Sequence, residues 1–284
     1  MELLLIGIGT GNPEHLTLQA IRALRSADLV LVPRKGAGRD ELADLRLALC
    51  SEILGDTPLA EFDMPERDPA IPGYLDRVEA WHDEIAALWR EAIAARPAPP
   101  ARAALLVWGD PALFDSTMRI AARLERDGTV ARTEVIPGIT AIAALTAAHR
   151  VPLNGLGAPV LLTTGRRLRD EGWPPEAPDR MLVMLDAGCA FEALEPAGIS
   201  IWWGAYLGMA GEITEAGPLA EAAPRIRQIR TEARAARGWI MDIYLLVRGR
   251  GDDSVRERGD DSLRERESLP DGAGRGISED ARAG

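Results

Sequence analysis

The sequence predicts an α/β protein built of two α/β domains. Short apolar segments that end in glycine or proline alternate along the chain with segments of helical apolar periodicity. Such alternation favours a largely parallel sheet with helices on both of its faces. The alternation continues through both halves of the chain, and 284 residues suffice for two modest domains. We therefore expect one domain in residues 1–139 and a second in residues 140–248.

The apolar pattern places each element in order. In the first domain, strands are expected at residues 3–9, 29–33, 104–109 and 133–137. Helices are expected between them, at residues 18–26, 42–53, 74–95 and 116–126. In the second domain, strands are expected at residues 160–165, 181–185, 199–205 and 239–247. Apolar runs this short and bounded by turn residues are typical of buried strands.

Residues 249–284 differ in composition from the rest of the chain. They contain an imperfect charged repeat, RGDDSVRERGDDSLRERES, and few bulky apolar side chains. Such a segment buries too little apolar surface to offset its ordering entropy, so we expect a disordered tail. An arm that docks onto a partner is the alternative interpretation.

Composition and charge exclude several classes of function. The chain has 33 basic and 44 acidic residues, a net charge of −11, which argues against a nucleic-acid substrate. The single lysine, Lys35, precedes Gly36 and not Ser or Thr, which excludes a P-loop. The two cysteines are far apart and the three histidines are scattered, so no metal is expected. No apolar run approaches the roughly 18 residues of a membrane span. The first residues, MELLLIGIG, resemble a buried strand and not a signal peptide, so we expect a cytoplasmic protein.

A glycine-rich turn follows the first expected strand. Gly7, Gly9 and Gly11 resemble the start of a dinucleotide-binding fingerprint. That fingerprint would need a further glycine where Asn12 stands and an acidic residue where Pro33 stands, so NAD is disfavoured. A tight turn between strand and helix is the simpler interpretation.

Two further turns follow apolar strands. Residues 108–111 read Trp-Gly-Asp-Pro, and residues 137–140 read Pro-Gly-Ile-Thr before a helix rich in small residues. Open α/β sheets bind ligands at the carboxyl ends of their strands, which is where both turns would lie. Each turn taken alone is also compatible with a purely structural role.

The order and spacing of these three turns resemble those of a known family. Together with Val-Pro-Leu at 151–153, they are similar to the class III S-adenosylmethionine-dependent methyltransferases, the tetrapyrrole methylase family. The resemblance covers residues 3–248. The phrases DRVEAWH (76–82), WGAYLG (203–208) and GWIMD (238–242) resemble those of the deacetylating members, which act in cobalamin synthesis. The resemblance implies two α/β domains with S-adenosylmethionine in the cleft between them.

The resemblance also implies which residues contact the cofactor. The matching positions are Thr10, Trp108, Gly109, Asp110, Leu113, Thr140, Ala141, Asp186, Tyr206 and Leu207. Three of them depart from the family pattern. Many relatives have proline at the position of Thr10, glycine at that of Trp108, and methionine near that of Asp186.

The implied reaction is methylation of C-1 of precorrin-5 with release of the ring acetyl group as acetate. The substrate is a small-molecule tetrapyrrole with many carboxylates, which arginine binds through two oxygens at once. Arg34 and Lys35 follow the second expected strand, and Arg166 and Arg167 follow the strand at 160–165. We expect these residues to bind the substrate, with solvated surface pairs as the alternative. The resemblance further implies a homodimer.

The reaction requires that the protein position the two reactants and supply one general base. Methyl transfer from a sulfonium is an in-line displacement, so the protein orients the reactants and excludes water. Release of acetate needs a water molecule activated by a base. His82 is one candidate, because it flanks the apolar stripe of the helix at 74–95 and would line the edge of the cleft. Asp110 is the other. A histidine with a structural role and an aspartate that shapes its turn are the alternatives.

Rival functions lie inside and outside the family. The chain could methylate another precorrin, an RNA or a protein residue, although its acidic charge disfavours RNA. A non-catalytic ligand-binding protein that keeps the fold is the rival from a different class.

Overall fold

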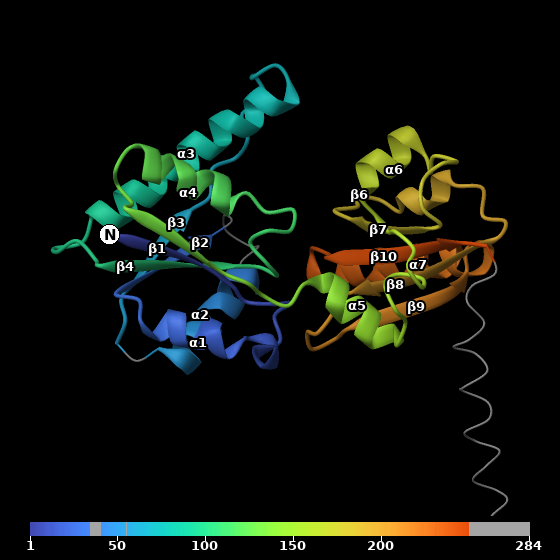
Figure 1. Cartoon of the computed structure of the whole chain (residues 1–284), viewed down its shortest axis with the longest axis horizontal. Coiled ribbons are helices and arrows are strands. Elements are labelled where there is room, and N and C mark those ends of the chain that lie inside the picture. Colours follow the sequence, from blue (N-terminus) through green and yellow to red (C-terminus); the bar gives the residue numbers. More distant parts are fainter. Residues whose placement is uncertain (35–40, 55, 250–284) are drawn as a thin grey trace, which may run out of the picture.

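The computed structural model describes residues 1–34, 41–54 and 56–249, which form two five-stranded sheets, one in each half of the chain (Figure 1). Two predictions fall outside the described residues. They are the substrate contact assigned to Lys35 and the disordered state of the tail beyond Gly249.

The first sheet is parallel throughout, in the order β3-β2-β4-β1-β5. Its strands are β1 (Glu2–Gly7), β2 (Leu29–Arg34), β3 (Leu59–Asp63), β4 (Arg102–Val107) and β5 (Arg132–Ile136). Because all five strands run in one direction, their carboxyl ends lie at a single edge. Ligands of open α/β sheets bind at that edge.

Helices cover both faces of the first sheet, as expected (Figure 1). Leu3 and Leu5 of β1 pack in a core with α3 (Tyr74–Ala94) and α4 (Thr117–Arg126). Leu4 and Ile6 pack in a second core with α1 (Leu18–Arg25) and α2 (Glu41–Ile53). The alternation follows from the pleat, which directs successive side chains to opposite faces.

The second sheet is mixed, in the order β6-β7-β10-β8-β9. Its strands are β6 (Leu161–Thr164), β7 (Arg180–Met184), β8 (Ile199–Ala205), β9 (Ile213–Pro218) and β10 (Asp242–Arg248). Only β6 and β7 pair in parallel, so the expectation of a largely parallel sheet is wrong for this half. The short segment from β8 to β9 can join antiparallel neighbours, whereas a parallel pair needs a longer crossover.

Helices also lie on both faces of the second sheet. One core contains side chains of α6 (Gly165–Glu171), η2 (Ala190–Ala193) and α7 (Leu219–Arg237), and the other contains those of α5 (Ala141–His149). Residues 137–140 lead from β5 of the first sheet to α5, which contacts β8 and β10. The predicted division between residues 139 and 140 falls in this segment.

The strands β3 and β9 were not predicted. Both are edge strands with polar residues, and β9 contains Gly217 and Pro218. Such residues weaken the apolar signal that identifies a strand. Within the described part of the chain, no helix has the length and apolar character of a membrane span.

Candidate functional site

The three glycine turns meet at the carboxyl ends of β1, β4 and β5. Gly9 and Gly109 form an isolated antiparallel bridge, with N···O distances of 3.2 and 2.7 Å. A Cβ atom on Gly7 would lie 2.6 Å from the nitrogen of Gly138, and one on Gly138 would collide with the carbonyl oxygen of Gly109. Only residues without a side chain allow the three backbones to approach this closely.

Asp110 links two of these turns through a hydrogen bond. Its Oδ2 accepts a hydrogen bond from the amide of Gly138 at 2.9 Å, and its Oδ1 accepts one from the amide of Ala112 at 2.8 Å. Both carboxylate oxygens therefore have backbone donors. The geometry supports the turn-shaping alternative for Asp110 over the role of a general base.

Space for a ligand lies beside Gly109. Its φ of +68° favours glycine, and a Cβ atom there would meet nothing within 4 Å. Leu113 closes the same turn, with its amide 3.1 Å from the carbonyl oxygen of Asp110. Phe114, which follows it, is an exposed aromatic side chain. A ligand at this turn could therefore approach the main chain of Gly109 closely.

The turn at 137–140 ends at the first residues of α5. Thr140 is the N-cap of this helix, and its Oγ1 accepts a hydrogen bond from the amide of Ala143 at 3.3 Å. Ala141 is the first helical residue. These two residues therefore lie where the chain passes from the first sheet to the second.

The second domain reaches this edge through the loop that follows β8. A Cβ atom on Gly208 would overlap Oγ1 of Thr10 and lie 2.9 Å from Cε1 of His15. Gly11 is similarly enclosed by the ring of Trp108 and by the side chain of Met209. The structure thus brings Thr10 and Trp108 together with the loop that contains Tyr206 and Leu207. We call this contact the domain junction.

Tyr206 and Leu207 direct their side chains into their own domain. The Tyr206 hydroxyl donates to the carbonyl oxygen of Trp239 at 2.6 Å, and Leu207 is part of the core beside α5. The guanidinium of Arg237 lies 4.4 Å from the centre of the Tyr206 ring. A ligand at the junction would therefore meet the backbone of these two residues.

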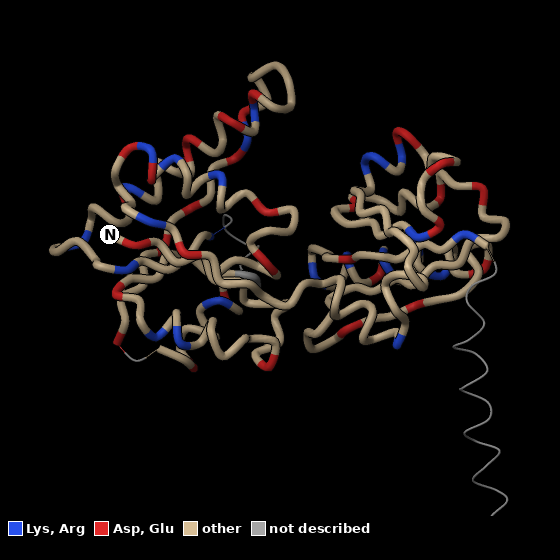
Figure 2. Tube along the Cα trace, viewed as in Figure 1, with Lys and Arg blue, Asp and Glu red and all other residues tan. Residues whose placement is uncertain are grey.

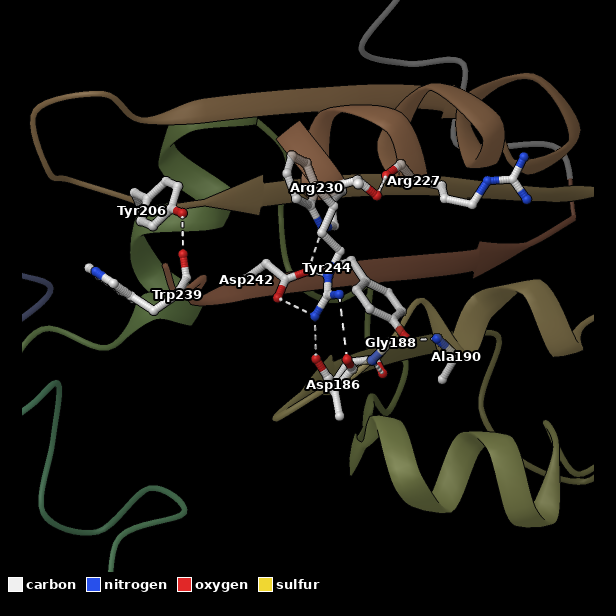
Figure 3. Close-up of polar contacts among 12 residues, drawn as sticks. Asp186, Gly188, Ala190, Tyr206, Arg227, Arg230, Trp239, Asp242 and Tyr244 are labelled. Carbon is white, nitrogen blue, oxygen red and sulfur yellow. Dashed lines mark hydrogen bonds and ion pairs between the residues drawn. The ribbon is translucent and has the colours of Figure 1, made fainter. Parts of the chain in front are cut away.

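The Asp186 carboxylate also faces inwards, into a buried polar network (Figure 3). It accepts hydrogen bonds from the Tyr244 hydroxyl at 2.8 Å and from the amides of Gly188 and Ala190 at 3.0 and 2.6 Å. Its side chain is 1% exposed. Because these oxygens already have donors inside the domain, the predicted contact between Asp186 and the cofactor would involve its backbone and not its carboxylate.

The second half of the network is an ion pair beside Asp186. Arg230 donates from Nε to Asp242 at 3.0 Å and from Nη2 to the carbonyl oxygen of Asp186 at 2.7 Å. Trp203 donates to the same carboxylate of Asp242 at 2.8 Å. Burial raises the pKa of Asp242, against the opposing effect of Arg230 and Trp203. Burial also raises the pKa of Tyr244, which keeps its hydroxyl protonated as a donor.

The predicted substrate arginines have different surroundings. The Arg166 guanidinium lies 5.2 Å from the centre of the Tyr74 ring, a contact from α6 of the second domain to α3 of the first. Arg167 is exposed and pairs with Glu171 one turn along α6. Arg34, at the end of β2, pairs with Glu61. Acidic and basic residues are interspersed over both domains (Figure 2).

His82 lies in the core and does not line a cleft. It is 1% exposed and lies on the buried face of α3 with Ile85, Ala86 and Trp89. Neither ring nitrogen has a hydrogen-bond partner among the described residues. Burial, and then the charge of Arg123, lower the pKa of His82. The predicted edge placement is wrong because α3 packs against α4, so its buried face is wider than the apolar stripe suggested.

Sequence reasoning missed the histidine that does lie at the junction. Nδ1 of His15 is 2.8 Å from Oγ1 of Thr10, and its ring packs against Gly208. Arg46 was also missed. It donates from Nε to the carbonyl oxygen of Leu106 near the end of β4, and burial lowers its pKa to about 10. Their positions in the sequence could have indicated them. His15 follows the glycine-rich turn after β1, and Arg46 lies on α2, which contacts β2. Among the described residues, no cluster of His, Cys, Asp and Glu could hold a metal ion.

Comparison with known proteins places this geometry in context. A family model described as Tetrapyrrole (Corrin/Porphyrin) Methylases matches residues 2–223. Precorrin-6A synthase (deacetylating) from Sinorhizobium sp is 46% identical over 255 residues, which is 89% of this chain and 97% of that protein. The same organism's precorrin-2 C(20)-methyltransferase is 34% identical over 52% of this chain and 59% of its own length.

Solved structures agree with this family. A cobalamin synthesis related protein from Corynebacterium diphtheriae has a TM-score of 0.74 and 34% identity, over 87% of this chain and 99% of that one. The uroporphyrin-III C-methyl transferase of Thermus thermophilus, complexed with S-adenosylhomocysteine, has a TM-score of 0.57. At 21% identity over 87% of this chain and 97% of its own, it shares the fold. The family match, the identity over nearly the whole of one relative and the shared fold lead to one conclusion: the chain belongs to the tetrapyrrole (corrin/porphyrin) methylase family.

Proposed function

We propose that this protein is an S-adenosylmethionine-dependent C-methyltransferase of cobalamin biosynthesis. It methylates C-1 of precorrin-5 and releases the ring acetyl group as acetate. One observation carries the proposal: the identity of 46% extends over 97% of a precorrin-6A synthase (deacetylating). The precorrin-2 C(20)-methyltransferase, in contrast, matches only 52% of this chain, which disfavours another precorrin as substrate.

The cofactor is held at the domain junction by backbone atoms. When bound, S-adenosylmethionine supplies a methyl group activated by its sulfonium. Gly109 offers an open backbone, Thr10 contacts the loop that contains Tyr206 and Leu207, and Thr140 lies two residues after Gly138, which packs on Gly109. Fixing these groups before the ligand arrives lowers the entropic cost of aligning methyl donor and acceptor.

The reaction balances with water as the only further reactant. Water adds to the acetyl carbonyl, and the bond between that carbonyl carbon and the ring breaks. The electron pair of this bond enters the ring system and is available for the new bond from C-1 to the methyl group. Acetate and two protons leave. Asp110 shapes its turn and His82 stays in the core, so neither serves as the base in this scheme.

Binding of S-adenosylhomocysteine tests the cofactor assignment. At a concentration 100 times its Kd, a ligand of the native state stabilises the protein by about 2.7 kcal/mol. For a protein of this size that corresponds to a rise in Tm of roughly 5–10 °C. NAD and ATP should leave Tm unchanged. A rise in Tm with NAD and none with S-adenosylhomocysteine would contradict the proposal.

Arg166 is the substrate contact that the geometry favours, and Arg167 is its matched control. Arg166 spans the two domains, whereas the Arg167 guanidinium is already paired with Glu171. Losing a charge-assisted bond to a substrate carboxylate should weaken binding about tenfold or more. We expect Arg166→Gln to raise the Kd for precorrin-5 by that factor and Arg167→Gln to leave it unchanged. Equal Kd values for both variants and the wild type would remove Arg166 from the substrate site.

Three predictions from sequence accompany this proposal and are not tested by the structure. They are the homodimeric state, the cytoplasmic location and the absence of a nucleic-acid partner. Sedimentation of the purified chain would measure the first.

A further inference from the structure

Leu185 is an exposed apolar residue in an unusual backbone conformation. It follows the last residue of β7, its side chain is 63% exposed, and its φ is +52°. Leucine rarely adopts a positive φ, and such strain persists only where the surrounding structure enforces it. Its conformation therefore has to be explained by its neighbours.

The neighbour that enforces it is Asp186. The Tyr244 hydroxyl and two backbone amides hold its carboxylate inside the domain, and Arg169 Nη2 lies 3.4 Å from its Oδ1, so the residue after Leu185 cannot turn outwards. Gly165 leaves no further room, because a Cβ atom there would lie 2.5 Å from Cβ of Asp186. With Asp186 fixed inwards, the Leu185 side chain is presented on the outside of the sheet edge.

Arg230 connects the turn after β7 to the neighbouring strand β10 by hydrogen bonds. Its guanidinium bonds both the carbonyl oxygen of Asp186 and the carboxylate of Asp242, the first residue of β10 (Figure 3). Arg230 and Asp242 are themselves buried. One cationic side chain thus fixes the end of β7 relative to the start of β10.

Leu185 lies between two places where the described parts of the domains touch. In the sheet order β6-β7-β10-β8, Arg166 follows β6 and contacts Tyr74, whereas Gly208 lies in the loop after β8 and contacts Thr10. The end of β7 is between these contacts on the same edge. Leu185 is thus exposed on the edge that carries both contacts, and Arg166, two residues after the neighbouring strand β6, is a cation on the same edge that can bind carboxylates.

We propose that Leu185 contacts the tetrapyrrole ring and that Arg230 is a positioning residue that holds it there through Asp186. The assignment rests on the proposed function and adds the apolar part of the substrate site. A tetrapyrrole has a broad apolar ring face and a rim of carboxylates. Leu185 offers the ring an apolar contact, and Arg166 offers the rim a charged one.

The first test compares Leu185→Ala with Leu162→Ala. Leu162 is an exposed leucine of β6 in the same domain, 41% exposed. We expect Leu185→Ala to raise KM for precorrin-5 about tenfold, as loss of an apolar substrate contact does. Its Kd for S-adenosylhomocysteine should stay at the wild-type value. Leu162→Ala should change neither constant. An unchanged KM in Leu185→Ala overturns the assignment of Leu185.

The second test compares Arg230→Lys with Arg227→Lys on the same helix. Lysine keeps the charge beside Asp242 but lacks the planar fork that reaches two acceptors. Arg227 pairs with Glu192 on the surface. We expect Arg230→Lys to raise KM for precorrin-5 at unchanged affinity for S-adenosylhomocysteine, and Arg227→Lys to change nothing.

A double-mutant cycle separates positioning from general stability. If Arg230 acts through Leu185, adding Arg230→Lys to Leu185→Ala should raise KM by much less than the product of the single effects. Independent, multiplicative effects overturn the positioning role. A wild-type chain that binds S-adenosylhomocysteine but does not turn over precorrin-5 overturns the proposed substrate as well. Normal turnover with an insensitive Leu185 overturns this inference alone.

Discussion

The two halves of the candidate site are built in different ways. In the first domain, Gly7, Gly109 and Gly138 let three strand ends approach through their backbones, and the Asp110 carboxylate links two of the turns. In the second domain, side chains hold the strand ends together. Asp186 forms a buried network with four residues of β8, α7 and β10, namely Trp203, Arg230, Asp242 and Tyr244. At Gly7 and Gly138 the backbone half leaves no room for a side chain, whereas the side-chain half depends on each hydrogen bond being satisfied.

The difference predicts where each half is vulnerable. A backbone contact fails when a side chain is added, and a buried polar network fails when one partner is removed. The two domains should therefore respond in opposite ways to small substitutions, which the following variants measure.

The largest effect is expected from Gly138→Ala. The added Cβ would collide with the carbonyl oxygen of Gly109, and neither backbone can move without opening the turns. Overpacking of this kind costs about 3 kcal/mol of unfolding free energy. Binding of S-adenosylhomocysteine should be lost as well. Denaturant unfolding and calorimetry measure the two effects.

Gly188→Ala is the matched control in the second domain. An added Cβ there would meet nothing within 4 Å, so both quantities should stay at the wild-type values. If Gly138→Ala were as harmless as Gly188→Ala, the close packing of the three turns would be refuted.

A smaller effect is expected from Tyr244→Phe. It removes a donor from the buried Asp186 carboxylate and should cost about 2 kcal/mol of unfolding free energy. Tyr206→Phe removes a donor from the neutral carbonyl oxygen of Trp239 and should cost about 1 kcal/mol. Chemical denaturation of both variants measures the ranking. The reverse ranking would show that the Asp186 network contributes less than its geometry indicates.

The smallest effect is expected from His82→Leu. The folded pKa of His82 is lowered, so the unfolded state binds its proton more readily and wild-type stability falls as pH drops below about 6.5. Leucine removes this dependence and an unpartnered polar group, so the variant should be more stable by about 1 kcal/mol, and by more at pH 5.5 than at pH 7.5.

Acetate release distinguishes the two roles of His82. The core placement predicts wild-type release from His82→Leu. Methyl transfer without acetate release in this variant would restore His82 as the general base.

The backbone half of the site could be predicted from sequence, and the side-chain half could not. Gly7, Gly109 and Gly138 are recognisable because each ends or follows an apolar strand, and because close backbone approach or a positive φ requires that residue type. Asp186 has no such local signature. Its partners Arg230 and Tyr244 are 44 and 58 residues away along the chain, so only the fold brings them together.

The fold itself shows the same division. The parallel sheet of the first domain was predictable from strands that are apolar on both faces. The antiparallel pairing of β8, β9 and β10 was not, because the edge strand β9 carries polar residues, glycine and proline. Its neighbour α7 likewise contains Pro224, which obscures the helical pattern.

Analysis of the reaction products tests the central claim most directly. The wild-type protein is incubated with precorrin-5 and S-adenosylmethionine. The mass of the tetrapyrrole product is then measured by mass spectrometry, and free acetate is measured in the same sample. The account predicts one methyl group gained, the acetyl group lost, and one acetate released for each S-adenosylhomocysteine formed. A product that gains a methyl group and keeps its acetyl group would contradict it, as would cofactor turnover without acetate.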